Sequence, residues 1–297
     1  MYSLFLNNRD LNSLLLPLYE AAVSGMLLEV STTPKPGLVD RNNSGAHRDM
    51  DFNLFMRSTA SISFYMYEFA KAGFNHDGDL KELIYKIKPI GIKAEENMFK
   101  ETHGVNTQKG IIYLMGLVCS ASGFLIKQGN PFNSEDICST VSNICKDQVE
   151  DELKSISKKE NLSSGERIYL KCGIRGVRGE ASKGLPCVAL KGLPFLKGGL
   201  LRGLSLNDSM VQSLIGIMSL VEDTTVISRH NTDVLYNFVH IKAKEALDLG
   251  GMFTKEGKEA ITGMDKLFIE KNVSPGGAAD LLAVTYAIYD IENKYKK

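Results

Sequence analysis

Hydrophobic residues recur at intervals of three and four along most of the chain, the spacing that places them on one face of an α-helix. Near the start, Leu14, Leu15, Leu18 and Ala22 form such a series. The pattern predicts helices over residues 11–30, 51–72, 80–100, 108–127, 135–159, 206–222, 232–249, 255–271 and 275–294. Alternating β-type runs are scarce, and residues 188–193 are the nearest strand candidate. We therefore predict an all-α fold, a single multi-helix domain over residues 1–297.

Two helical segments have special features. Residues 51–72 are apolar nearly all round, which predicts a buried central helix. Pro89 lies inside residues 80–100, and proline removes a backbone donor, so this segment is expected to be kinked or broken there.

Charge and composition narrow the function classes. Lys and Arg together number 35 and Asp and Glu 35, so the net charge is zero and argues against nucleic-acid binding by bulk positive charge. Five cysteines without a C-x-x-C pair favour reduced thiols and a cytoplasmic location. We see neither a signal peptide nor an apolar run near the roughly 20 residues of a membrane span, so no membrane association is expected.

The first chemical segment covers residues 29–51. Two prolines and a glycine predict a rigid loop that holds Lys35 and Arg41 beside Asp40. Asp49 and Asp51 then precede the buried helix, and carboxylates so placed can share a divalent cation with phosphates. The alternative is that one of them simply caps the helix.

Residues 103–110 form the second segment. Asn106 or Thr107 is expected to cap the next helix, with Lys109 and Gly110 in its first turn. A cation there opposes the helix dipole, whereas free N–H groups with an ammonium suit an anion. The Walker A pattern is absent.

The third segment, residues 171–202, holds seven Lys or Arg and one acid, Glu180. Its many glycines let a backbone approach a ligand, and arginines such as Arg175 and Arg178 bind phosphate oxygens in pairs. A solvated basic loop is the alternative. Glu180 is then either a salt-bridge partner or an acid/base group.

In the fourth segment, residues 272–280, Ser274 followed by proline is typical of a helix start. Gly276 and Gly277 would lie in the first turn, where each costs about 1 kcal/mol against alanine. This cost indicates close approach of either a ligand or another helix. Asp280 enters an apolar helix and would need a partner if buried.

A fifth, weaker segment contains Asp223 and Arg229, which can act at the same site or form an ordinary ion pair. Lone histidines such as His47 are more often structural than catalytic. Together the segments predict an all-helical protein that binds a phosphate-rich, nucleotide-like ligand with a divalent cation.

At these segments the chain resembles the triphosphoribosyl-dephospho-CoA synthase family. The resemblance spans nearly the whole chain and rests on TPKPGLVDR (33–41), GAHRDMDF (45–52), EENM with GVNTQKG (95–110), RGEASKGLP (178–186) and SPGGAADLLAVTY (274–286). One element departs from the family's pattern: its His-Arg-Gly-Gly is Ser228-Arg229-His230-Asn231 here.

The resemblance implies a magnesium-dependent pentosyltransferase. ATP and 3′-dephospho-CoA would give 2′-(5″-triphosphoribosyl)-3′-dephospho-CoA and adenine. The product would be the precursor of the prosthetic group of an acyl carrier protein, in citrate lyase or malonate decarboxylase, and a prosthetic-group transferase would then use it.

On this basis we assign hypothetical roles. The candidate phosphate-binding residues are Lys35, Arg41, Lys109, Arg175 and Arg178. The further substrate-binding candidates are Asn106, Thr107, Arg229, Ser274, Gly276 and Gly277. The candidate Mg²⁺ ligands are Asp40, Asp49, Asp51 and Glu96. Glu180 or Asp51 is the candidate base, and His47 would orient the acceptor or protonate the base.

Two other classes share these features. One is a Mg²⁺-dependent hydrolase of an N-glycosidic or ADP-ribosyl bond, which uses water as the acceptor. The other is a non-catalytic nucleotide-binding protein, which would bind ATP without turnover.

Overall fold

The computed structural model describes residues 10–156 and 161–295, and within these ranges the regular elements are helices, with no strand. The first helices are α2 (Leu11–Ser31), α3 (Phe52–Phe74), α4 (Leu83–Glu101), α5 (Lys109–Gln128) and α6 (Ser134–Ser155). The middle helices are α7 (Ser164–Cys172), α8 (Gly176–Ser182), α9 (Leu193–Leu201), α10 (Leu206–Met218) and α11 (Thr224–Arg229). The last are α12 (Thr232–Val234), α13 (His240–Asp248), α14 (Lys255–Glu270) and α15 (Gly276–Tyr295). The predicted all-α fold is confirmed.

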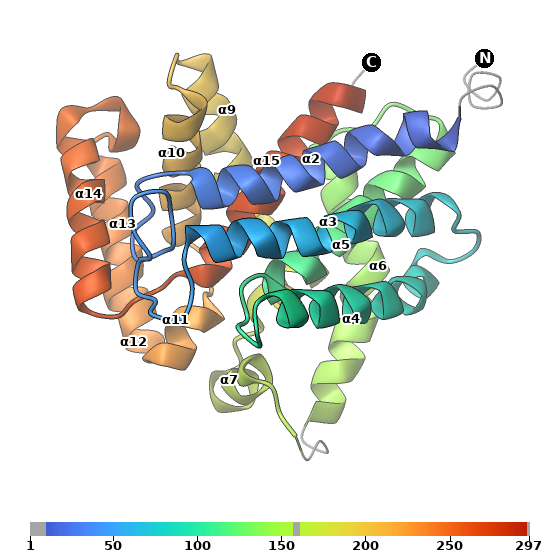
Figure 1. Ribbon diagram of the computed structural model, residues 1–297, viewed down its shortest axis with the longest axis horizontal. Coiled ribbons are helices and arrows are strands. Elements are labelled where there is room, and N and C mark those ends of the chain that lie inside the picture. The colour runs from blue at the N-terminus through green and yellow to red at the C-terminus, as the bar shows by residue number, and fades with distance from the viewer. Residues whose placement is uncertain (1–9, 157–160, 296–297) are drawn as a thin grey trace.

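In the series α2, α3, α4 and α5, each helix runs antiparallel to the one before it. The loops after α2 and after α4 therefore lie at the same end of the molecule (Figure 1). Helix α15 returns from the C-terminal part of the chain to pack against α2, α5 and α10. One continuous cluster of buried apolar side chains runs from Leu14 to Ile291. The first and last described helices are therefore parts of the same core.

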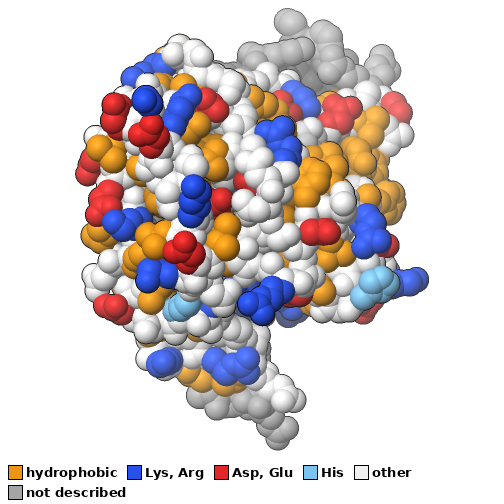
Figure 2. Space-filling view, turned by 60° about the vertical axis from the view of Figure 1, so that its left-hand side comes forward, with side chains coloured by type: hydrophobic (Ala, Val, Ile, Leu, Met, Phe, Trp, Pro, Cys, Tyr) orange, Lys and Arg blue, Asp and Glu red, His pale blue; other side chains and the backbone are white. Residues whose placement is uncertain are grey.

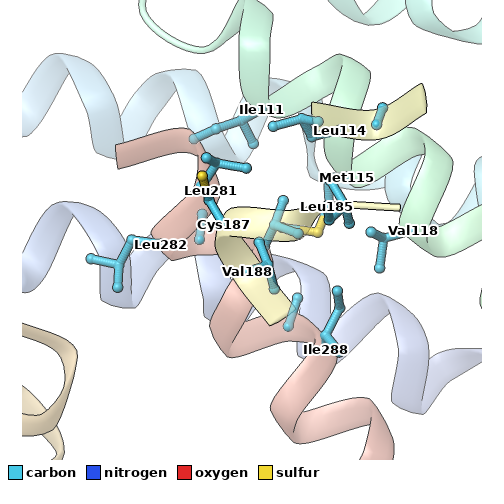
Figure 3. Packing of buried hydrophobic residues seen from close by; sticks show 14 of the residues in the cluster. Ile111, Leu114, Met115, Val118, Leu185, Cys187, Val188, Leu281, Leu282 and Ile288 are labelled. Carbon is cyan, nitrogen blue, oxygen red and sulfur yellow. The ribbon is translucent and has the colours of Figure 1, made fainter. Parts of the chain in front are cut away.

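The core centre joins α5, α15 and the segment around Leu185 (Figure 3). Leu114 and Val118 of α5 and Leu281 and Ile288 of α15 are fully buried there, around this segment. Burial of one such side chain contributes about 1.5–3 kcal/mol, so this packing holds the three elements together.

Two expectations need correction. The basic, glycine-rich stretch of residues 171–202, which lies outside the predicted helices, is mostly helical, because it contains α8, α9 and a π-helical turn, Val188–Gly192. That turn also replaces the strand candidate at 188–193. Two glycines of the stretch allow close packing against other helices. A Cβ at Gly192 would lie 2.3 Å from Thr285 Oγ1, and one at Gly199 would lie 2.7 Å from Ser209 Oγ.

The segment around Pro89 is not broken at the proline, which was one of the two outcomes expected for it. A 3₁₀ turn, Leu80–Glu82, leads directly into α4, and Pro89 lies within this continuous helix. The last residues of the helix predicted over 135–159 lie outside the described residues, and α6 ends at Ser155.

Two helices in the described part of the chain, α2 and α5, are long and apolar enough to cross a membrane by length and composition. The expectation that no apolar run approaches that length was therefore too strict. Half of the apolar window of α2 and 72% of that of α5 are buried inside the fold, as in core helices.

On one face of the molecule, positive and negative side chains are interspersed (Figure 2).

Candidate active site

A cleft of about 550 Å³ opens where α2 and α4 end and where α3, α5 and α15 begin. Segments that are far apart in the sequence meet there, since this is the end of the molecule at which their connecting loops lie. The predicted site residues that line the cleft are Lys35, His47, Asn106, Thr107, Lys109, Arg178, Ser274, Gly276 and Gly277.

The loop after α2 is held by the carboxylate of Asp40. One oxygen accepts hydrogen bonds from Thr33 Oγ1 (2.6 Å) and the Lys35 amide (3.1 Å). The other accepts from the amides of Asn42 (2.7 Å) and Asn43 (3.0 Å). Asp40 is buried, and these four bonds occupy its oxygens. Its carboxylate therefore stabilises the conformation of the loop.

Lys35 is buried in the cleft wall and pairs with Glu29 from the last turn of α2. The pKa of Glu29 is raised, because the effect of burial exceeds that of the neighbouring ammonium, which lowers it. Because breaking one partner away would leave a buried charge uncompensated, the two side chains act as a unit.

His47, Ser274 and Arg229 form a chain of hydrogen bonds. A guanidinium only donates, so Arg229 Nη2 donates to His47 Nδ1 at 3.0 Å. The proton of the neutral ring is then on Nε2, which donates to Ser274 Oγ at 2.8 Å. Burial and Arg229 lower the pKa of His47 and favour this neutral form, although Asp49 at 3.7 Å acts in the opposite direction. The Ser274 hydroxyl is left free to donate its own proton into the cleft.

The first turn of α5 forms another wall of the cleft. As predicted, Lys109 and Gly110 begin the helix, but its N-cap is Gln108, without a side-chain capping bond, and not Asn106 or Thr107. Asn106 Oδ1 accepts from the Lys109 amide at 3.2 Å. Thr107 instead bonds Ser58, with 2.7 Å between the two hydroxyl oxygens. The Lys109 ammonium lies 2.8 Å from Glu95, which also lines the cleft.

The start of α15 is capped by a distant carboxylate. Asp223 Oδ2 accepts from the Ala278 amide at 2.9 Å, while Oδ1 caps α11 through the Thr225 and Val226 amides. A Cβ at Gly277 would lie 3.1 Å from the Asp223 carboxyl, and one at Gly276 would lie 3.0 Å from Thr225. The glycines thus allow close approach by another element, one of the two alternatives that the sequence left open.

In the basic segment, Arg178 reaches the cleft but Arg175 does not. Arg178 Nη1 lies 3.0 Å from Glu152 and 3.7 Å from Glu166, and Arg175 pairs with Glu150. Glu180 accepts from the Cys187 amide at 3.1 Å and its thiol at 3.0 Å.

The structure does not bring the four predicted metal ligands together. Asp51 is exposed and caps α3 by accepting from the Leu54 amide at 2.7 Å, so the capping alternative describes it. Asp49 is 63% exposed, and Glu96 lies on the exposed face of α4, one residue from the cleft-lining Glu95. Among the described residues, no group of three or more His, Cys, Asp or Glu is placed to hold a metal ion.

Two further predicted residues lie outside the cleft lining. Arg41 is exposed and donates to Asn207 Oδ1 at 3.3 Å. Arg229 acts through His47 and also donates to the Ala46 carbonyl at 2.8 Å.

The cleft also contains acidic and phenolic groups that sequence reasoning did not select. Glu29 and Glu95 are the carboxylate partners of predicted cations, and Tyr113 of α5 has a buried hydroxyl close to Cys145. Asp280 was noted only as a charge in need of a partner. Glu95 lines the cleft and its neighbour Glu96 is exposed, because successive residues of a helix point in different directions. Glu29 pairs with Lys35, six residues later, only because the loop after α2 turns back toward the helix.

Comparison with known proteins identifies the family of the chain. The family model described as CitG: ATP:dephospho-CoA triphosphoribosyl transferase matches residues 17–297. A probable 2-(5″-triphosphoribosyl)-3′-dephosphocoenzyme-A synthase of Vibrio cholerae is 41% identical over 276 residues, 93% of this chain and 88% of that protein. No solved structure matches the chain.

Two proteins named 2-(5″-triphosphoribosyl)-3′-dephosphocoenzyme-A synthase are also similar. The one from Pectobacterium atrosepticum is 39% identical over 93% of this chain and 89% of its own length. The one from Klebsiella pneumoniae is 37% identical over 90% and 88%, respectively. The match extends over all five segments of the site, and the chain belongs to the ATP:dephospho-CoA triphosphoribosyl transferase family.

Proposed function

We propose that this protein transfers the 5-triphosphoribosyl group of ATP to the 2′-hydroxyl of 3′-dephospho-CoA and releases adenine. Family membership indicates the reaction. The observation that carries the proposal is a single cleft in which the first turns of α5 and α15 meet the side chains of Lys109 and Arg178. Helix N-termini and cations together suit the phosphates of two nucleotides.

The phosphates would exchange places with carboxylates that now pair with the cations. The Lys109 and Glu95 side chains are 52% and 30% exposed, and a pair this accessible contributes about 1 kcal/mol or less. Opening it therefore costs little. Lys35 differs, because its pair with Glu29 is buried, and we assign it to the wall of the site rather than to direct exchange.

Ser274 is the proposed hydroxyl donor to an anionic substrate group. Its oxygen accepts from His47 Nε2–H, and its own O–H is free to point to a ligand oxygen. Arg229 holds the His47 ring in the orientation that this hydrogen bond to Ser274 requires, and it is therefore a positioning residue.

The reaction passes through a ribosyl centre with oxocarbenium character. The acceptor oxygen forms a bond to C1′ of the ribose as the bond from C1′ to adenine breaks, and the triphosphate remains intact. The site must therefore hold the triphosphate, remove the hydroxyl proton and help the purine to leave. Glu180, predicted as the base, is committed to Cys187, and Asp51 to capping α3, so we place acid/base chemistry with the cleft carboxyls instead.

Magnesium does not fit as a resident cofactor of this chain, since the predicted ligands are dispersed and Asp40 is fully engaged. Among the lining residues, Glu29 and Glu95 offset Lys35 and Lys109. We propose that Mg²⁺ enters bound to the triphosphate, as part of the nucleotide substrate, and supplies positive charge that the cleft lacks.

The wider setting is also a proposal. The product would serve an acyl carrier protein through a prosthetic-group transferase, in citrate lyase or malonate decarboxylase. A cytoplasmic location is supported by five cysteines that are all free. The continuous core supports action as a single domain over residues 1–297.

Adenine release from Mg·ATP, with and without 3′-dephospho-CoA, tests the proposal. We expect adenine only with the acceptor, together with an acceptor product whose mass has grown by one triphosphoribosyl group. Adenine released without the acceptor would indicate the hydrolase. Tight ATP binding without adenine release under either condition would indicate a non-catalytic nucleotide-binding protein.

A further inference from the structure

One carboxyl group in the cleft has no partner. Asp280 lies in the second turn of α15 and lines the cleft. Across the described residues, no hydrogen bond or ion pair involves its side chain, whereas Glu29 and Glu95 are each paired with a lysine. A polar group left uncommitted at the wall of a ligand cleft is available to a ligand.

Gly110 leaves the space that this carboxyl occupies. A Cβ at residue 110 would lie 1.9 Å from Asp280 Oδ2, so any other residue there would displace the carboxyl. Gly110 also stands in the first turn of α5, beside Lys109. Asp280 is thus next to one of the two helix starts that we assign to substrate phosphates.

The surroundings of Asp280 favour its protonated form. Burial is the main cause that raises its pKa well above the usual range, and the nearby carboxylates of Glu29 and Asp223 add to it. Lys35 is already paired with Glu29, and Asp223 is held by backbone amides. The positive end of α5 acts in the opposite direction, but as a partial charge it is weaker than burial and two carboxylates together.

We propose that Asp280 is the general acid that protonates the departing adenine, an inference that rests on the proposed function. Three other acid/base candidates are engaged. The Nε2 proton of His47 is donated to Ser274, Glu180 accepts from Cys187, and Glu29 is paired with Lys35.

The step balances as follows. Asp280 donates its proton to a ring nitrogen of adenine as the bond between C1′ and N9 breaks, with its electron pair going to the base. The acceptor 2′-oxygen bonds to C1′ and loses its proton, which returns through solvent to the Asp280 carboxylate. The net transfer is one proton from the acceptor hydroxyl to adenine.

The test uses Asp280→Asn with two donors. ATP needs a proton on its base before the base can leave, whereas N7-methylated ATP carries a cationic base that leaves without one. With 3′-dephospho-CoA as acceptor, we expect Asp280→Asn to lower transfer from ATP by about 10²–10⁴-fold and transfer from the methylated donor by less than about threefold. Asp265→Asn is the matched control, because its carboxylate holds the loop through Gly37 and Asn43 outside the cleft lining. It should affect both donors equally.

The remaining outcomes count against the inference. Equal losses with both donors would assign Asp280 a structural or binding role, and full activity with ATP would exclude it as the acid. A protonated aspartic acid and asparagine are both neutral and of similar size, so a large fall in the melting temperature of Asp280→Asn would also contradict the protonated state. If the wild-type protein released no adenine in the presence of acceptor, the proposed function itself would fail.

Discussion

Arg229 lies in the element at which the resemblance led us to expect His-Arg-Gly-Gly. The chain has Ser228-Arg229-His230-Asn231 there, and the arginine orients His47. Asn231 caps α12 by accepting from the Val234 amide at 2.9 Å, and His230 bonds the Asn272 carbonyl at 3.0 Å. The departing residues thus have local partners, and the hydrogen-bond chain to Ser274 does not need the glycines.

The buried, neutral His47 predicts a pH dependence of stability. Its pKa in the folded protein is below the ordinary value of 6.5, so the unfolded chain binds a proton more readily. The stabilisation is complete above that value and is lost as the pH falls below it. In His47→Gln, the decrease in melting temperature between about pH 7 and pH 5 should be smaller than in the wild type.

His240 sets the background in this experiment. Burial lowers its pKa too, so part of the pH dependence should persist in His47→Gln and disappear when His240→Gln is added. Melting temperatures that fall in parallel in the wild type and His47→Gln would show that His47 is not held neutral.

At the scale of elements, α3 and α5 approach each other through glycines. A Cβ at Gly73 would lie 1.9 Å from the Ser120 carbonyl oxygen, and one at Gly123 would lie 2.1 Å from that of Ala70. Both contacts are to backbone atoms, which cannot rotate away as a side chain can. The two helices therefore need glycine at these positions to pack this closely.

Gly73→Ala should destabilise the protein by about 1–3 kcal/mol or more, because the two helices must separate. Gly263→Ala in α14 is the control, since no atom lies within 4 Å of its Cβ. That substitution should stabilise by about 0.5–1 kcal/mol through helix propensity. Urea unfolding measures both, and a Gly73→Ala protein at least as stable as the wild type would refute this packing.

Helical periodicity predicts most of these elements, and it fails where glycine has another use. Residues 171–202 look like a loop because glycine disfavours helices. In the fold, Gly192 and Gly199 instead allow α9 and its preceding turn to pack against Thr285 and Ser209. Intrinsic propensity cannot reveal such packing, because the partners come from α15 and α10.

At the scale of the molecule, the site depends on which helix ends meet. The sequence locates the segments that line the cleft, since prolines, glycines and cations mark them. It does not reveal their partners: Glu29 for Lys35, Glu95 for Lys109 and Asp223 for the start of α15. These contacts depend on the phase of a helix, the turn of a loop or a separation of 55 residues. The predicted metal ligands fail for the same reason, because neighbours in the sequence point in different directions.

The most direct test of the account is a crystal structure of the protein with Mg·ATP in the absence of acceptor. We predict the triphosphate at the first turns of α5 and α15, in contact with Lys109 and Ser274, and the adenine base within hydrogen-bond distance of Asp280. A second groove lies on α14 and is lined by Lys255, Lys258 and Lys266 among others. Nucleotide bound there or elsewhere, with the cleft left empty, would contradict the account.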